Sequence, residues 1–197
     1  FENESFSHHG KHYDLPPRVP YRGYELEELT LVPRPTHPVE TWQPIVSGSQ
    51  RGLDFMVKHG IKGVVGGGSA LMSEGPMVGY RDALARAGIE AELGTGLAVG
   101  VNFHIADSKE QAIKEATPFY EEHIKMFAPL GFFRGLSDEQ LAAVARRGGW
   151  AEAGIPTLNE ACESRSWYCG PPEGFIEYLH ELDEAAPGIE MVNVQAS

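Results

Sequence analysis

A short turn of small and polar residues carries the clearest chemical signal in this sequence. Ser47, Gly48, Ser49, Gln50 and Arg51 follow an apolar run and precede a stretch with helical periodicity. Backbone N–H groups at a helix start have no intrahelical acceptor, and a glycine lets the backbone approach a ligand closely. Together with a serine hydroxyl and an arginine, these groups suit a phosphate or another anion. An ordinary strand-to-helix turn capped by serine has the same composition, so the stretch alone leaves both interpretations open.

Three more positions are candidates for a pocket. Gly67 belongs to a triple glycine that Ser69 follows, where either a ring or substrate approaches the backbone or the chain simply turns. His104 lies in an apolar segment. It either faces a pocket as an acid or base, or packs in the core or at the rim of the pocket. Four aromatic residues either line an apolar substrate cavity or belong to the core: Trp167, Tyr168, Phe132 and Phe133.

Other reactive side chains point to no site of their own. His8, His9 and His12 lack a second ligand group at the usual spacing, so we expect no metal site there. Cys162 and Cys169 are too few to suggest a disulfide framework, and we expect buried or idle thiols in a reducing compartment.

The elements that must position these residues alternate between strand and helix. Residues 1–43 are rich in proline and histidine and predict an irregular excursion, in which residues 24–32 form an extended segment or a hairpin arm. Beyond them, hydrophobic runs predict parallel strands near residues 44–47, 61–65, 97–105 and 189–194. Helices are expected over residues 50–59, 73–87, 108–127, 138–147 and 171–184. Residues 148–170 are expected to be irregular or to hold a short helix.

This alternation predicts an α/β fold with a parallel sheet, either an open doubly wound sheet or part of a (β/α)8 barrel. A complete barrel needs about 250 residues and eight strands. Four strands with their helices cannot close one, so the barrel interpretation requires strands from elsewhere. Barrel active sites lie at the carboxyl ends of the strands, which are residues 47–51, 66–69, 102–104 and 195–197 here.

Several segments in a fixed order resemble a known enzyme family. These segments are residues 6–13, 31–35, 43–49, 57–60, 105–112 and 169–173, followed by a closing strand at 191–195. Their order and spacing are similar to those of bacterial-luciferase-like flavin-dependent monooxygenases over nearly the whole chain. The resemblance implies the C-terminal four βα units of a (β/α)8 TIM barrel, with the N-terminal strands missing from this chain.

The same resemblance implies a function and its cofactor. A family member uses reduced FMN, supplied by a flavin reductase, and O2 to insert one oxygen atom into a small organic substrate. Residues 47–51 would hold the FMN phosphate, with Ser49 as the best match, while Gly52 stands where some relatives carry a hydroxyl residue. The catalytic residues and much of the ring pocket are expected in the missing N-terminal half, so none is assigned here. The alternatives are an F420-dependent oxidoreductase on the same barrel and a non-catalytic subunit that binds flavin or pairs with an active partner.

Composition limits the partners. The net charge is -12, which argues against nucleic acid, and no apolar run is long enough to span a membrane. We therefore expect a cytoplasmic protein. We also expect the chain to require its missing N-terminal half, as attached sequence or as a companion chain, to be inactive without it, and to form a homodimer, as is common among relatives.

Overall fold

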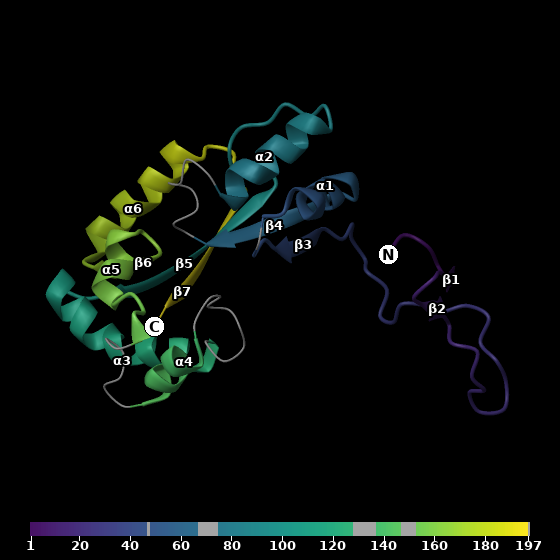
Figure 1. Ribbon diagram of the computed structural model, residues 1–197. Coiled ribbons are helices and arrows are strands. Elements are labelled where there is room, and N and C mark those ends of the chain that lie inside the picture. Colours follow the sequence, from purple (N-terminus) through teal and green to yellow (C-terminus); the bar gives the residue numbers. More distant parts are fainter. Residues whose placement is uncertain (47, 67–74, 128–136, 147–152, 197) are drawn as a thin grey trace. The chain divides into compact units, whose positions relative to one another are not determined.

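The computed structural model describes residues 1–46, 48–66, 75–127, 137–146 and 153–196. The chain divides into two compact units, Phe1–Thr41 and Trp42–Ser197. Figure 1 shows the helices and strands of both units.

The first unit contains one very short hairpin. β1 (His8–His9) pairs antiparallel with β2 (Asp14–Leu15), and the Gly10 N–H donates to the Tyr13 carbonyl at 2.8 Å across the turn. A single antiparallel bridge joins Phe6 to Leu29. The hairpin with named strands forms around Gly10, while residues 24–32 take part only in isolated antiparallel bridges, from Tyr24 to Tyr21 and from Leu29 to Phe6.

The second unit is built on a mainly parallel sheet. Its strands are β3 (Thr41–Pro44), β4 (Ile61–Gly66), β5 (Leu97–Ile105), β6 (Trp167–Gly170) and β7 (Met191–Ala196). The order is β3-β4-β5-β6, and β7 also pairs with β5 (Figure 1). β5 is the longest strand and runs parallel to β4, β6 and β7, so it forms the centre of the sheet.

Six helices occur among the described residues. They are α1 (Gln50–Lys58), α2 (Pro76–Arg86), α3 (Lys109–Phe127), α4 (Asp138–Ala145), α5 (Leu158–Glu163) and α6 (Pro172–Ala185). The helices expected from the sequence are confirmed within a few residues at their ends. Glycine and proline mark several of these ends, as with Gly60 at φ 64° after α1 and a proline in the first turn of α6.

Two parts of the sheet differ from the expectation. The first strand lies at Thr41–Pro44 instead of near residues 44–47, although the Ile45 N–H still donates to the Val64 carbonyl at 2.9 Å. β6 was not expected at all, because four residues carry too short a pattern to be recognised and its pairing partner is 65 positions away in register, as Asn102 opposite Trp167. Within the described ranges the sheet consequently has five strands, where four were expected.

Two apolar clusters hold the second unit together. The first packs α1, α2 and α6 against β4 and β5, and its large buried members include Met77, Leu97, Val99, Tyr178 and Leu182. The second joins α3, α4 and α5 to β6 through small and medium side chains such as Ala116, Ala143, Leu158, Ala161 and Cys169. Alternate β6 side chains serve the two clusters, since Tyr168 packs with the first and Trp167 with the second. β6 is thus the element that connects the two clusters.

Candidate functional site

The turn between β3 and α1 has the geometry of a helix start open to a ligand. Gly48 adopts φ 55°, and Ser49 is the N-cap residue in an extended conformation. The Leu53 N–H makes the first helical bond, to the Ser49 carbonyl at 3.0 Å. The N–H groups of Gln50, Arg51 and Gly52 precede that bond and have no helical acceptor.

Ser49 is available for a ligand on two counts. Its side chain is exposed and makes no capping hydrogen bond to α1, which is the usual role of serine at this position. A Cβ atom at Gly52 would lie 3.0 Å from the Ser49 Oγ, so glycine leaves room for that hydroxyl. The glycine that departs from the family pattern thereby clears space beside the best-matching serine.

A hollow of about 220 Å³ lies at this turn. Its lining residues are Gln43, Pro44, Ile45, Val46, Gly48, Ser49, Gly52, Leu53 and Met56. Leu53 and Met56 are buried and belong to the first apolar cluster, while the first turn of α1 contains no acidic residue. The nearest acid on the helix, Asp54, pairs with Arg86 of α2 at 2.6 Å. The positive electrostatic potential at the N-terminus of α1 therefore faces the hollow, and no carboxylate in the first turn of the helix offsets it.

Some of the site residues predicted from the sequence lie together at this turn, and others do not. Gly48, Ser49, Gln50 and Arg51 are consecutive at the helix start, with the last three exposed. Ser47, Gly67 and Ser69 lie outside the described residues, as do Phe132 and Phe133.

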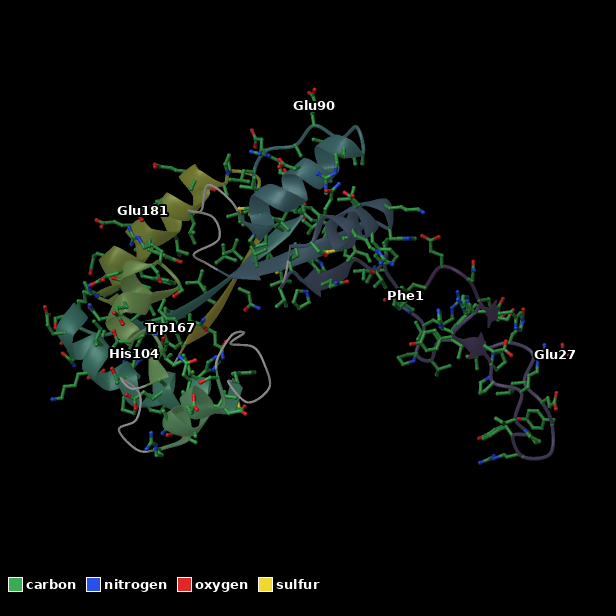
Figure 2. All side chains as sticks on the ribbon, in the orientation of Figure 1. Phe1, Glu27, Glu90, His104, Trp167 and Glu181 are labelled. Carbon is green, nitrogen blue, oxygen red and sulfur yellow. The ribbon has the colours of Figure 1, made fainter. Side chains whose placement is uncertain are left out.

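His104 is tied to α3. Its Nε2 lies 3.0 Å from a Glu115 carboxylate oxygen, and Gln111 donates to the other oxygen at 2.8 Å. These two hydrogen bonds, the one from Gln111 first, hold the pKa of Glu115 below its usual value. His104 and Trp167 come from the neighbouring strands β5 and β6 (Figure 2). The contacts of His104 fit the interpretation of a histidine packed at the rim.

A second hollow, of about 140 Å³, lies against the C-terminal half of β5, the end of β7, the first residue of β6 and one face of α3. Asn102, Phe119, His123, Trp167, Gln195 and Ala196 line it. Trp167 packs edge-on against Tyr120 with ring centroids 5.4 Å apart, and the Tyr120 hydroxyl donates to the Pro156 carbonyl at 2.8 Å. Burial raises the pKa of Tyr120 to about 12. The hollow therefore combines an aromatic wall with amide and imidazole groups that can hydrogen-bond to a polar ligand.

The sequence points to only some of the residues that line this second hollow. Asn102, Gln195 and Trp167 had been singled out by strand ends and aromatic character, but Phe119 and His123 had not. Their spacing of four residues on one helix places them on the same face, which is the signal that would have linked them. The side chain of Tyr168 lies on the other face of β6, where its ring packs at a tilt against Phe175 and joins the first cluster.

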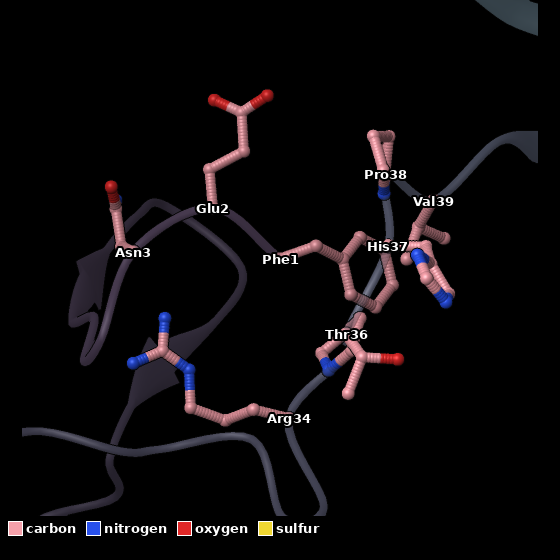
Figure 3. Close-up of a pocket in the computed structure, with 9 residues that line it drawn as sticks. Phe1, Glu2, Asn3, Arg34, Thr36, His37, Pro38 and Val39 are labelled. Carbon is pink, nitrogen blue, oxygen red and sulfur yellow. The ribbon is translucent and has the colours of Figure 1, made fainter.

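The first unit has a larger hollow of its own, about 700 Å³ in volume. Figure 3 shows Phe1, Arg34 and His37 among the residues that line it. All nine of its lining residues are exposed and come from segments without helix or strand. In this unit His9 Nδ1 lies 2.5 Å from Asp14 Oδ1. We take the sheet end of the second unit as the better candidate, since rigid elements position its residues.

The described part of the chain offers neither a metal-ligand cluster nor a membrane-spanning helix. No cluster of three or more metal-ligating side chains occurs there. None of its helices is long and apolar enough to cross a membrane.

No protein-family model matches this sequence, and no curated protein matches it. Solved structures do. One is the oxygenating constituent of 3,6-diketocamphane monooxygenase from the CAM plasmid of Pseudomonas putida, a type II Baeyer–Villiger monooxygenase in complex with FMN. It has 19% identity and a TM-score of 0.54, over 98% of this chain and 52% of that chain.

Two more are similar in the same way. The monooxygenase RslO1 from Streptomyces bottropensis has 14% identity and a TM-score of 0.53, over 90% of this chain and 48% of its own. An F420-dependent secondary alcohol dehydrogenase in complex with an F420–acetone adduct has 13% identity and a TM-score of 0.56, over 92% of this chain and 50% of its own. This chain thus spans about half the length of each. At such identities the likeness concerns the fold, and the chain has the α/β architecture of these oxidoreductases.

Proposed function

We propose that this chain forms the phosphate-binding part of a flavin-dependent monooxygenase that uses reduced FMN and O2 to insert one oxygen atom into a small organic substrate. The observation that carries the proposal is the β3–α1 turn, where the exposed Ser49, which makes no capping bond, lines a hollow at a helix start together with Gly48 and Gly52. Its place at the carboxyl end of a strand, in a fold shared with an FMN-bound monooxygenase, supports the choice of ligand.

The residues of this turn fit the phosphate of FMN. Ser49 would donate through its hydroxyl, and the N–H groups of Gln50, Arg51 and Gly52 would donate from the backbone. Arg51 would add a positive charge. Leu53 and Met56 keep the floor of the hollow apolar, which strengthens hydrogen bonds to the anion by excluding water. When bound, reduced FMN would supply the electrons that activate O2, and a flavin reductase would keep it reduced.

The second hollow supports a place for the substrate. Asn102 and Gln195 line it from the C-terminal halves of β5 and β7, and its amide and imidazole groups would orient a polar atom of a largely apolar molecule. We assign it to substrate contact, and assign the catalytic residues to protein outside this chain.

The exposed strand β7 supports the proposal that a companion polypeptide completes a barrel with this chain. All six residues of β7 are exposed, among them Met191, Val192 and Val194, and within the described part of the chain β7 pairs only with β5. An exposed strand with apolar side chains is a template for further pairing. We propose that a polypeptide supplying the N-terminal strands pairs there and completes the barrel. Sedimentation velocity tests this, because a stable monodisperse monomer with native unfolding cooperativity would contradict it.

F420 is the second candidate cofactor, favoured by the similar F420-dependent dehydrogenase. Titration of the protein with FMN and with F420, followed by protein fluorescence, distinguishes the two. The proposal expects binding of FMN and, with a flavin reductase, NADH and O2, substrate-dependent oxygenation. Binding of F420 alone would overturn it, and release of hydrogen peroxide with every substrate tested would indicate a flavin-binding subunit without catalysis.

A further inference from the structure

Two cysteines meet where α5 turns into β6. Cys162 lies in the last turn of α5, and Cys169 lies in β6. The Arg165 N–H donates to the Cys162 carbonyl at 3.1 Å, and the Ser166 N–H donates to the Ala161 carbonyl at 3.0 Å. Arg165 has φ 61°, so the chain reverses sharply and returns alongside the helix. This reversal brings Cys162 against the second apolar cluster, of which Cys169 is a member.

The reversal is fixed by buried groups. The hydroxyl of Tyr178, which is 1% exposed, donates to the Arg165 carbonyl at 3.0 Å. At the other end of α5, Thr157 and Glu160 form a capping box. Since both ends of the helix are anchored, the cysteines are held together by the fold rather than by chance contact.

The two sulfur atoms are not equivalent. Cys169 is buried at 4% exposure within the second apolar cluster, whereas Cys162 is half-buried at its edge. Hydrogen bonding by Cys169 and the positive potential of Lys109 both favour the thiolate form of Cys162. The hydrogen bond from Cys169 outweighs burial and lowers the pKa of Cys162. The same bond, with burial, raises the pKa of Cys169. A more accessible, thiolate-favouring sulfur therefore faces a buried, protonated one.

We propose that Cys162 and Cys169 are a peroxide-reactive pair that closes to a reversible disulfide. The Cys162 thiolate attacks hydrogen peroxide, an S–O bond forms, the O–O bond breaks, and the departing hydroxide takes a proton to become water. The Cys169 sulfur then attacks the Cys162 sulfenic acid. The S–S bond forms, the hydroxyl group leaves, and the Cys169 proton completes a second water. Two thiols lose two electrons in total, and one peroxide gains them.

The position of the pair links it to the second hollow. Trp167, which lines that hollow, lies two residues before Cys169 on the same face of β6. A disulfide would fasten this strand to α5 beside the proposed substrate contact. A flavin-dependent oxygenase releases hydrogen peroxide when turnover is uncoupled, so the source of oxidant rests on the proposed function, but the reactivity of the thiols does not.

Peptide mapping of the whole chain after treatment with hydrogen peroxide tests the proposal. We expect both thiols to become resistant to alkylation together, the linked peptides to have lost the mass of two hydrogen atoms, and dithiothreitol to restore both thiols. Thiols that stay fully alkylatable, or a disulfide that joins two chains, would overturn the proposal.

Matched serine variants test the two roles. In Cys169→Ser, Cys162 should stop at the sulfenic acid, which dimedone traps. In Cys162→Ser, oxidation of Cys169 should be at least about tenfold slower, because this thiol is buried at 4% exposure and peroxide reaches it poorly. Equal oxidation rates in the two variants would contradict this assignment of roles. If either variant fails to fold, the mapping of the wild-type chain alone decides whether the pair forms.

Discussion

The two hollows of the sheet unit are assembled in different ways. The β3–α1 turn takes its polar groups from consecutive residues, with Ser49 exposed and making no capping bond to the helix. The second hollow takes its lining from β5, α3, β6 and β7, and Trp167 in its wall is also part of an apolar cluster. The first is a local feature of one turn, whereas the second exists only when distant elements have packed.

This contrast has a consequence for mutations. A change at the turn should alter the binding of an anion and leave the free energy of unfolding almost unchanged, because the side chains involved pack against little. A change in the wall of the second hollow should alter stability first, because the same side chain holds α3 against β6.

The sharpest separation of binding from stability is expected for Ser49→Asp. Aspartate is a favoured N-cap residue near the positive end of the helix, so the melting temperature should stay the same or rise. Its charge beside the phosphate should weaken FMN binding by at least about 100-fold. Ser49→Asn is the matched control, since it has nearly the same shape without the charge. Titration by flavin fluorescence measures both, and an affinity of Ser49→Asp within threefold of Ser49→Asn would contradict phosphate binding at this turn.

The opposite behaviour is expected for Trp167→Ala. Loss of the ring removes the contact with Tyr120 and exposes the second apolar cluster, which should lower the free energy of unfolding by about 2 kcal/mol. Trp167→Phe keeps an aromatic ring and should lose less. Urea unfolding followed by circular dichroism checks both variants. An unchanged unfolding midpoint for Trp167→Ala would show that the wall of this hollow does not support the fold.

The same contrast explains what could be predicted from the sequence. The helix start at Ser49 was recognisable because a cap residue, a glycine and a periodic apolar face are neighbours in the sequence. The alternation of strands and helices identified the α/β class for the same reason. β6 was missed because its four residues become a strand only through pairing with β5. Phe119 and His123 were missed because their role depends on how α3 packs over the ends of strands far away in the sequence.

A smaller effect on the second region is expected from Thr157→Ala. The Thr157 side chain accepts from the Glu160 N–H at 3.3 Å, and the Glu160 carboxylate accepts from the Thr157 hydroxyl at 2.8 Å. Loss of this cap should destabilise α5 by about 1 kcal/mol, whereas Thr157→Ser should retain most of it. Thermal unfolding at neutral pH measures the difference, and equal melting temperatures for the alanine and serine variants would contradict it.

The capping interaction of Thr157 with Glu160 should also be detectable in the pH titration of Glu160. Two hydrogen bonds from Thr157 lower the pKa of Glu160 below its usual value of 4.5. The backbone N–H has the larger effect, and the hydroxyl has the smaller one. A carboxyl with a lowered pKa stabilises the fold fully above its unfolded pKa and loses this contribution as the pH falls through its folded pKa. Thr157→Ala removes the hydrogen bond from the hydroxyl and keeps the one from the backbone, so the pKa of Glu160 should rise only part of the way toward its usual value, which carboxyl NMR titration detects. An unchanged pKa would mean that the threonine hydroxyl does not hold the carboxylate.

The smallest effect is expected for Glu115→Gln. This exposed carboxylate accepts from Gln111 and faces His104, and its pKa is lowered by both. Its contribution should be present near neutral pH and lost as the pH falls below 4.5, so the variant should melt about 1 °C or less below the wild type at pH 7 and no lower at pH 3. A large loss at pH 7 would show that the pair with His104 supports the fold more than its exposure suggests.

The comparison of FMN with riboflavin tests the central claim most directly, because the two ligands differ only in the phosphate. If the β3–α1 turn binds that phosphate, isothermal titration of the protein should give at least about tenfold tighter binding of FMN. Inorganic phosphate should then compete with FMN and leave riboflavin unaffected. Equal affinities for the two ligands, with no effect of inorganic phosphate, would contradict the assignment of this turn to a flavin phosphate.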